Sequence, residues 1–130
     1  LNALVAADRV VVPCDMSILA FEGVADLLAT VQTVNFRLGQ NLDVLGILRT
    51  RVDGRTRQIN DAIGGALTDN YGELLLQTII PINSALAKAQ AAGLSIFQFQ
   101  KRSKGAEAYT MLAAEIYARL DLEEAAHISL

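Results

Sequence analysis

The sequence predicts an α/β fold in which helices flank a parallel β-sheet. Short apolar or β-branched runs alternate along the chain with longer segments whose apolar residues recur every three or four positions. One run, residues 44–48, is interrupted only by Gly46, which is typical of a strand that helices cover on both faces. Hydrophobic residues make up 52% of the chain and aromatic residues only 5%, which suits layered packing of Leu, Ile, Val and Ala. Alternating strands and helices form parallel sheets with right-handed crossovers.

Length and composition restrict the class of protein. The 130 residues are enough for one domain core but not for two. No apolar run approaches the roughly 18 residues of a membrane span, and the first residues lack the basic-then-apolar pattern of a signal peptide. Cys14 is the only cysteine, which excludes an internal disulfide and a cysteine-built metal cluster within one chain. We therefore expect a reduced, cytoplasmic setting.

The first half of the chain contains two expected strands and a long helix. Residues 1–7 are apolar and begin without a capping signal, and residues 9–13 form a β-branched run that ends at Pro13. Residues 17–39 have helical spacing and end at a glycine, Gly39. The second strand is expected at residues 44–50. The apolar positions of the helix are Ile18, Phe21, Val24, Leu27, Leu28, Val31 and Val34.

The second half continues the alternation. We expect a helix at residues 55–71 with Gly72 as its C′ residue, a strand at 75–81, a helix at 83–92 with Asn83 as its N-cap, a short edge strand at 95–99 and a last helix at 103–120. Three or four strands are fewer than the five or six of an average sheet, so we expect the second half of a larger domain. The last helix is expected to bury Tyr109, Leu112, Ala113, Ile116 and Leu120.

A cluster of arginines follows the strand at residues 44–50. Four arginines surround the turn at Asp53 and Gly54, at the carboxyl end of a strand and the start of a helix, where open α/β sheets bind ligands. Arginine suits bidentate contacts to phosphate. The alternative is a solvated helix start in which Asp61 pairs with Arg57, with Asp53 as a turn or capping residue. The polar residues of the cluster are Arg49, Thr50, Arg51, Asp53, Arg55, Thr56 and Arg57.

Two further groups are candidates for binding. Residues 80–83 leave the next strand at the same expected edge of the sheet, although this turn can equally be an ordinary strand exit and helix N-cap. Lys101, Arg102 and Lys104 precede the last helix and can equally be a basic loop. The net charge of −3 argues against a uniformly basic surface, but local basic patches can still bind phosphates.

The sequence contains no candidate catalytic group or metal site. His127, the only histidine, lies near the acidic C-terminus, and Cys14 is expected to be a small buried residue. The carboxylates do not cluster at the spacing of metal ligands. No phosphate loop of the form GxxxxGK[ST] occurs in the chain.

Five segments together resemble a known family. The segments are LNALVAADRVVVP, LAFEGVADLL, LGILRTRVDGRT, TIIPINSALAKAQAAG and KRSKGAEAYTMLAAEI. In order and spacing they resemble the C-terminal half of the ParA/Soj chromosome- and plasmid-partitioning ATPases, within the ParA/MinD group of deviant P-loop ATPases. The match covers about residues 1–120. It implies that residues 1–130 are the C-terminal half of a P-loop NTPase-like parallel sheet, part of a single ATPase domain whose P-loop and Mg²⁺ ligands lie outside this chain.

The resemblance also implies ligands and partners. Family members bind ATP or ADP with Mg²⁺, dimerise around ATP, bind nonspecific DNA and respond to a ParB-like partner, which implies a cytoplasmic, nucleoid-associated protein. The acidic residues 121–124 differ from the basic membrane-targeting tail of MinD, so we expect no membrane association. The residues matched to contacts with the nucleotide base are Thr50, Arg51, Pro81, Ile82 and Asn83. Those expected to contact DNA are Arg55, by its match to a family arginine, together with Arg57, Lys101, Arg102 and Lys104.

The chain departs from the family pattern at Ile82 and Ala85, where family members commonly have arginines. One expected DNA contact is therefore absent. Two alternatives also remain open. The chain can belong to a ParA/MinD-like ATPase that positions another cargo, or it can be a non-catalytic interaction module without a P-loop.

Overall fold

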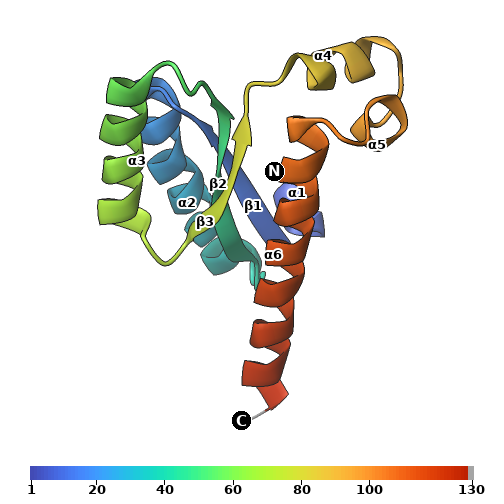
Figure 1. The fold of residues 1–130 in the computed structure, drawn as a ribbon. Helices are drawn as coiled ribbons and strands as arrows, with labels where there is room; N and C mark the ends of the chain where they lie inside the picture. The colour runs from blue at the N-terminus through green and yellow to red at the C-terminus, as the bar shows by residue number, and fades with distance from the viewer. Residues whose placement is uncertain (129–130) are drawn as a thin grey trace.

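The computed structural model describes residues 1–128, with side chains through Leu122, and confirms the predicted fold class. Three parallel strands form a sheet in the order β1-β2-β3. Helices α2 and α3 cover one face of this sheet and α6 covers the other (Figure 1). The strands are β1 (Arg9–Asp15), β2 (Asp43–Val52) and β3 (Leu75–Pro81). The helices are α1 (Asn2–Ala6), α2 (Ile18–Leu38), α3 (Arg57–Tyr71), α4 (Ser84–Ala91), α5 (Ile96–Phe99) and α6 (Lys104–Ile128).

The core has two layers that meet at β2. Ile47 is fully buried against α2 and α3, whereas its neighbour Leu48 packs on the opposite face against α6. This alternation confirms that residues 44–48 are covered on both sides. The α2/α3 layer is formed by Val12, Cys14, Val24, Ile47, Ile63 and Leu67, and the α6 layer by Leu48, Leu76, Ile80, Ala108 and Leu112.

Capping residues set the helix ends much as the sequence indicates. The hydroxyl of Ser17 accepts a hydrogen bond from the backbone N–H of Ala20 and begins α2, and Gly39 ends it in the left-handed conformation at φ 62°. Asn83 caps α4 through the N–H of Ala85, and Gly93 follows this helix with φ 68°. These local rules place both helices correctly from sequence.

The structure corrects three expectations. Residues 96–99 form the short helix α5 and no edge strand, because the N-cap Ser95 and Gln98 make a reciprocal capping box. Gly72 is the C-cap of α3 with a right-handed φ of −48°, and a Cβ there would lie 2.9 Å from the carbonyl oxygen of Thr68, so close approach explains this glycine. On α6, Tyr109 and Ala113 are exposed, while Leu112 is buried as expected.

Residues 1–7 resolve into α1, which contains no buried residue. Within residues 1–128, none of the helices combines the length and apolar character needed to span a bilayer. His127 lies outside the part of the chain whose side chains the structure describes.

Candidate functional site

The carboxyl ends of β2 and β3 form a cavity of about 420 Å³ together with α4 and α6. The five residues matched to base contacts from sequence all line this cavity: Thr50, Arg51, Pro81, Ile82 and Asn83. The remaining lining residues are Ile80, Leu86, Ala87, Gln90 and Tyr109. An apolar interior with a few polar groups is the usual character of a small-molecule site. We call this space the strand-end cavity.

Thr50 connects the strand-end cavity to β1. Its hydroxyl donates a 2.6 Å hydrogen bond to Oδ1 of Asp15, the residue that pairs with Thr50 across the parallel ladder. Sequence reasoning did not select Asp15. The signal available was its position at the end of the first strand, at the same sheet edge as Thr50.

Arg51 has an unusual backbone. Its φ is 50°, and among the described residues no other non-glycine residue has a positive φ. Left-handed backbone costs a residue with a side chain about 1–2 kcal/mol, and such residues cluster at functional sites. The exposed Arg51 side chain therefore leaves the sheet from a backbone position that regular β-structure would not provide.

The β3 end of the strand-end cavity is tied to β2 and to α4. The backbone N–H of Ile82 donates to the carbonyl oxygen of Val52 at 3.0 Å. The side-chain oxygen of Asn83 accepts from the N–H of Ala85 at 3.2 Å as the N-cap of α4. Asn83 thus has a structural role, as its alternative interpretation expects, while it also lines the cavity.

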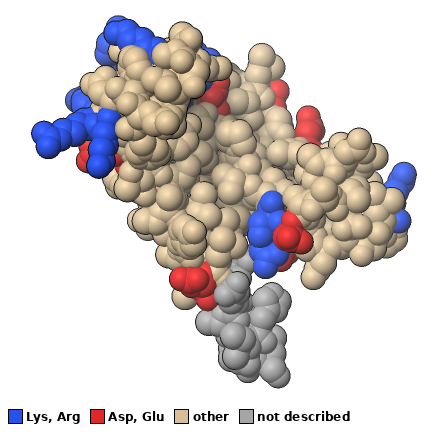
Figure 2. All heavy atoms as spheres, turned by 90° about the vertical axis from the view of Figure 1, so that its right-hand side faces the viewer, with Lys and Arg blue, Asp and Glu red and all other residues tan. Residues whose placement is uncertain are grey.

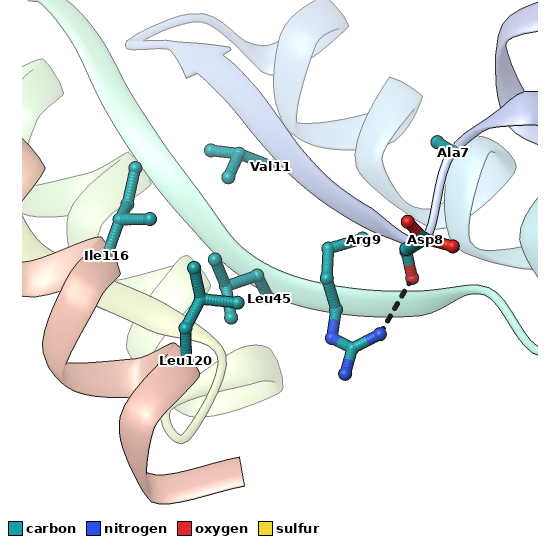
Figure 3. A pocket seen from close by; sticks show the side chains of 7 residues that line it. All are labelled: Ala7, Asp8, Arg9, Val11, Leu45, Ile116 and Leu120. Atoms are coloured by element: carbon teal, nitrogen blue, oxygen red, sulfur yellow. Dashed lines mark hydrogen bonds between the residues drawn. The ribbon is translucent and has the colours of Figure 1, made fainter. Parts of the chain in front are cut away.

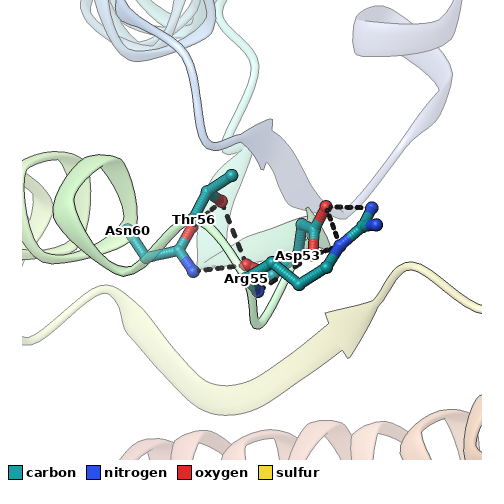
Figure 4. Close-up of polar contacts among 4 residues, drawn as sticks. All are labelled: Asp53, Arg55, Thr56 and Asn60. Carbon is teal, nitrogen blue, oxygen red and sulfur yellow. Dashed lines mark hydrogen bonds and ion pairs between the residues drawn. The ribbon is translucent and has the colours of Figure 1, made fainter.

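The turn between β2 and α3 is a compact polar cluster (Figure 4). Arg55 donates to Asp53 from its Nε at 3.0 Å and its Nη2 at 2.8 Å, and this bonding lowers the pKa of Asp53 to about 2. The carbonyl oxygen of Asp53 accepts from Thr56 and from the side-chain amide of Asn60. Asp53 is therefore a turn residue, as expected. The Arg55 side chain is 88% exposed despite this ion pair.

The remaining basic candidates are exposed but do not form one group. Arg57 begins α3, and within the described residues it makes no ion pair with Asp61. Lys101, Arg102 and Lys104 lie at the start of α6, on the other side of the sheet from α3 (Figure 1). Seen from the side of α4, α5 and α6, Lys and Arg gather at the upper left while most of the surface is uncharged (Figure 2). The two basic groups thus flank the carboxyl end of the sheet on opposite faces.

A second cavity, of about 720 Å³, lies near the opposite end of β1 and holds none of the candidate residues. Its walls come from β1, β2 and α6, with Val11, Leu45, Ile116 and Leu120 around Arg9 (Figure 3). A guanidinium nitrogen of Arg9 donates to the carbonyl oxygen of Asp8 at 3.1 Å. The described residues contain no group of three or more His, Cys, Asp or Glu that could hold a metal ion.

Comparisons with known proteins agree with the resemblance, although no family model matches the chain. The chain is 45% identical to the chromosome-partitioning ATPase Soj of Thermus thermophilus over 120 residues, which are 92% of the chain and 48% of that relative. It is 36% identical to the sporulation initiation inhibitor protein Soj of Bacillus subtilis, covering 91% of the chain and 46% of that protein. The chain thus spans about half the length of the curated relatives it matches.

Solved structures show the same fold with related sequence. A cobyrinic acid a,c-diamide synthase of Mycobacterium smegmatis, with bound ATP analogue and magnesium, superimposes with a TM-score of 0.61 and 35% identity over 83% of this chain and 38% of the synthase chain. The three-stranded parallel sheet therefore corresponds to a fragment of a P-loop NTPase-like fold. By sequence, the chain is a homologue of the Soj and ParA chromosome-partitioning ATPases over most of its own length.

Proposed function

We propose that this chain is the base-recognising and DNA-contacting half of a ParA-type partitioning ATPase. In this proposal the complete protein binds ATP with Mg²⁺, dimerises around the nucleotide, and holds nonspecific DNA to segregate plasmid or chromosome DNA. A ParB-like partner stimulates hydrolysis at the nucleoid, and the hydrolytic residues lie outside this chain. The observation that carries the proposal is that the two segments matched to base contacts, residues 50–51 and 81–83, line one cavity at the ligand-binding edge of the sheet.

The chemistry of the strand-end cavity suits an adenine base. Ile80, Pro81 and Leu86 offer apolar surface to the faces of a flat ring, and the half-exposed Tyr109 offers an aromatic one. Thr50 and Asn83 supply polar groups that can fix the edge of the base. The cavity volume of about 420 Å³ lies within the usual range of ligand pockets.

Base binding is tested by titrating adenosine, ATP and GTP into the ¹⁵N-labelled chain and following backbone amide signals. Adenosine and ATP are expected to shift the signals of Ile82 and Asn83, and GTP to shift them less. Asn83→Ala should weaken adenosine binding about tenfold, the equivalent of about 1.4 kcal/mol. Asn70→Ala on the exposed end of α3 is the matched control. Shifts that avoid the strand-end cavity would contradict the assignment.

DNA binding is tested in the complete protein with Arg55→Glu. This exposed guanidinium is expected to contact backbone phosphates, so the substitution should abolish salt-sensitive retention of nonspecific DNA and leave nucleotide binding intact. Arg37→Glu, a charge reversal at the exposed end of α2, is the control. Unchanged DNA retention by Arg55→Glu would refute the role of Arg55.

One observation favours the alternative of an ATPase that positions another cargo. Ile82 is 55% exposed at the rim of the strand-end cavity, where the family pattern has an arginine, so an apolar group replaces a phosphate contact. The same DNA assay separates the alternatives. Nucleotide binding without DNA retention in the wild-type protein would support another cargo.

A further inference from the structure

β3 contains an irregularity close to the strand-end cavity. Ile47 pairs with Leu75 and Arg49 pairs with Ile79, so β2 advances by two residues while β3 advances by four. The two additional residues form a bulge whose backbone groups cannot all pair with β2. We call residues 76–78 the β3 bulge. Buried backbone groups without partners are unfavourable, so other groups must satisfy them.

A carboxylate of α6 binds the β3 bulge directly. The backbone N–H of Gln77 donates to Oε2 of Glu115 at 2.7 Å, and the N–H of Thr78 donates to Oε1 at 2.8 Å. Partial burial would raise the pKa of Glu115, but the hydrogen bonds from Thr78 and Gln77 and the charge of Arg119 outweigh it and lower the pKa. Glu115 therefore holds the bulge as a carboxylate.

Two arginines complete the polar contacts around the β3 bulge. Arg119, one turn beyond Glu115 on α6, donates to the carbonyl oxygens of Leu45, Leu74 and Leu75 at 2.7, 3.2 and 3.1 Å. Arg49 donates to the carbonyl oxygen of Leu76 at 3.2 Å. Charged groups make stronger hydrogen bonds than neutral ones. The bulge is thus fixed from α6 and from β2.

The β3 bulge, together with a second register shift between Arg49 and Val52, sets where β3 ends relative to β2. Val52 pairs with Pro81, and the residues that follow Pro81 form one wall of the strand-end cavity. Another wall contains Tyr109, which lies on α6 together with Glu115. Glu115 itself does not line the cavity. Glu115 instead connects α6, which contributes Tyr109 to the cavity, with β3, which leads into the opposite wall at residues 82–83.

We propose that Glu115, supported by Arg119, is a positioning residue for the strand-end cavity: its carboxylate fixes the β3 bulge and thereby holds the Pro81–Asn83 segment at a set distance from Tyr109. A change in the contact between α6 and β3 is then transmitted to the cavity. Only the identity of the ligand, an adenine nucleotide, rests on the proposed function.

The test compares the ligand-free chain with Glu115→Gln by hydrogen exchange and amide chemical shifts. Glutamine keeps the shape of the side chain but has only one acceptor oxygen. One of the two bulge amides, that of Gln77 or that of Thr78, should therefore exchange its hydrogen faster. The amide signals of Ile82 and Asn83 should shift with it. Glu22→Gln on the exposed surface of α2 is the matched control and should change neither. Loss of protection at Gln77 or Thr78 without any change at Ile82 and Asn83 would overturn the proposal.

A conservative variant and a ligand extend the test. Glu115→Asp keeps the charge but shortens the side chain, so it should shift the same cavity signals less than Glu115→Gln, and it replaces that variant if the glutamine protein does not fold. Adenosine should bind Glu115→Gln at least about threefold more weakly, as expected for the loss of one hydrogen bond. If the wild-type chain binds no adenosine, the proposed function fails, while the ligand-free shifts still decide the role of Glu115.

Discussion

At the residue scale, Arg51 has a strained left-handed backbone, and its cationic side chain lies at the rim of the strand-end cavity. A positive φ at a non-glycine residue is maintained only where the surroundings enforce it. Here the hydrogen bond between Ile82 and Val52 fixes the backbone just beyond Arg51. Glycine would adopt this conformation at lower cost. The arginine is thus retained at a position where its backbone is unfavourable, which is consistent with a role for its side chain.

The strain at Arg51 predicts the outcome of a pair of substitutions. Arg51→Gly should change the free energy of unfolding by less than about 0.5 kcal/mol, because relief of the left-handed backbone offsets the greater flexibility of glycine. Arg57→Gly, at an exposed position with right-handed helical backbone in α3, should destabilise by up to about 1 kcal/mol. Urea denaturation measures both. Greater destabilisation by Arg51→Gly than by Arg57→Gly would show that Arg51 is not strained.

At the element scale, the contact between α6 and the sheet depends on a glycine in β2. A Cβ at Gly46 would lie 2.8 Å from Cγ of Leu76 and 3.0 Å from Nη1 of Arg119. Both distances are too short for ordinary packing, and both neighbours belong to the contacts that hold the β3 bulge. The glycine that interrupts the apolar run is therefore explained by the close approach of α6 and β3 to β2.

Gly46→Ala should therefore destabilise the protein by about 1–3 kcal/mol, the usual cost of forcing a group into a packed core. Gly64→Ala is the matched control, since no atom lies within 4 Å of a Cβ at that position in α3. Alanine is a better helix former than glycine, so the control should stabilise by about 0.5–1 kcal/mol. Thermal unfolding of the two variants is expected to shift in opposite directions. Equal shifts would mean that Gly46 is not sterically required.

Local patterns predict the elements of this fold better than they predict its contacts. The helical spacing of residues 17–39 and the glycine at its end identified α2, because both signals lie within the segment itself. The strand-end rule also brought Thr50 and Asn83 to one edge from residue order alone. The β3 bulge could not be predicted in this way. Its partners Glu115 and Arg119 lie some 40 residues further along the chain and give no local signal.

At the scale of the whole molecule, the two edges of the sheet differ in how they are protected. β3 contains the bulge, and two backbone N–H groups of this bulge already donate hydrogen bonds to Glu115. Another strand therefore cannot pair with them in a regular way. Among residues 1–128, no strand pairs with the outer edge of β1. The second cavity, a groove of about 720 Å³ beside Val11 and Leu45, also leaves apolar surface next to this strand. β1 contains Pro13, which lacks a backbone donor for strand pairing.

The open edge of β1 predicts concentration-dependent self-association of the chain. A second copy can pair its own β1 with this edge and cover the groove beside Val11. Val11→Lys places a charge in that groove and should raise the concentration needed for association by about tenfold, equivalent to about 1.4 kcal/mol. Val5→Lys, on the exposed surface of α1, adds the same charge and should leave association unchanged. Sedimentation velocity over a range of concentrations measures each protein. If Val5→Lys suppressed association as strongly as Val11→Lys, net charge and not the β1 edge would control it.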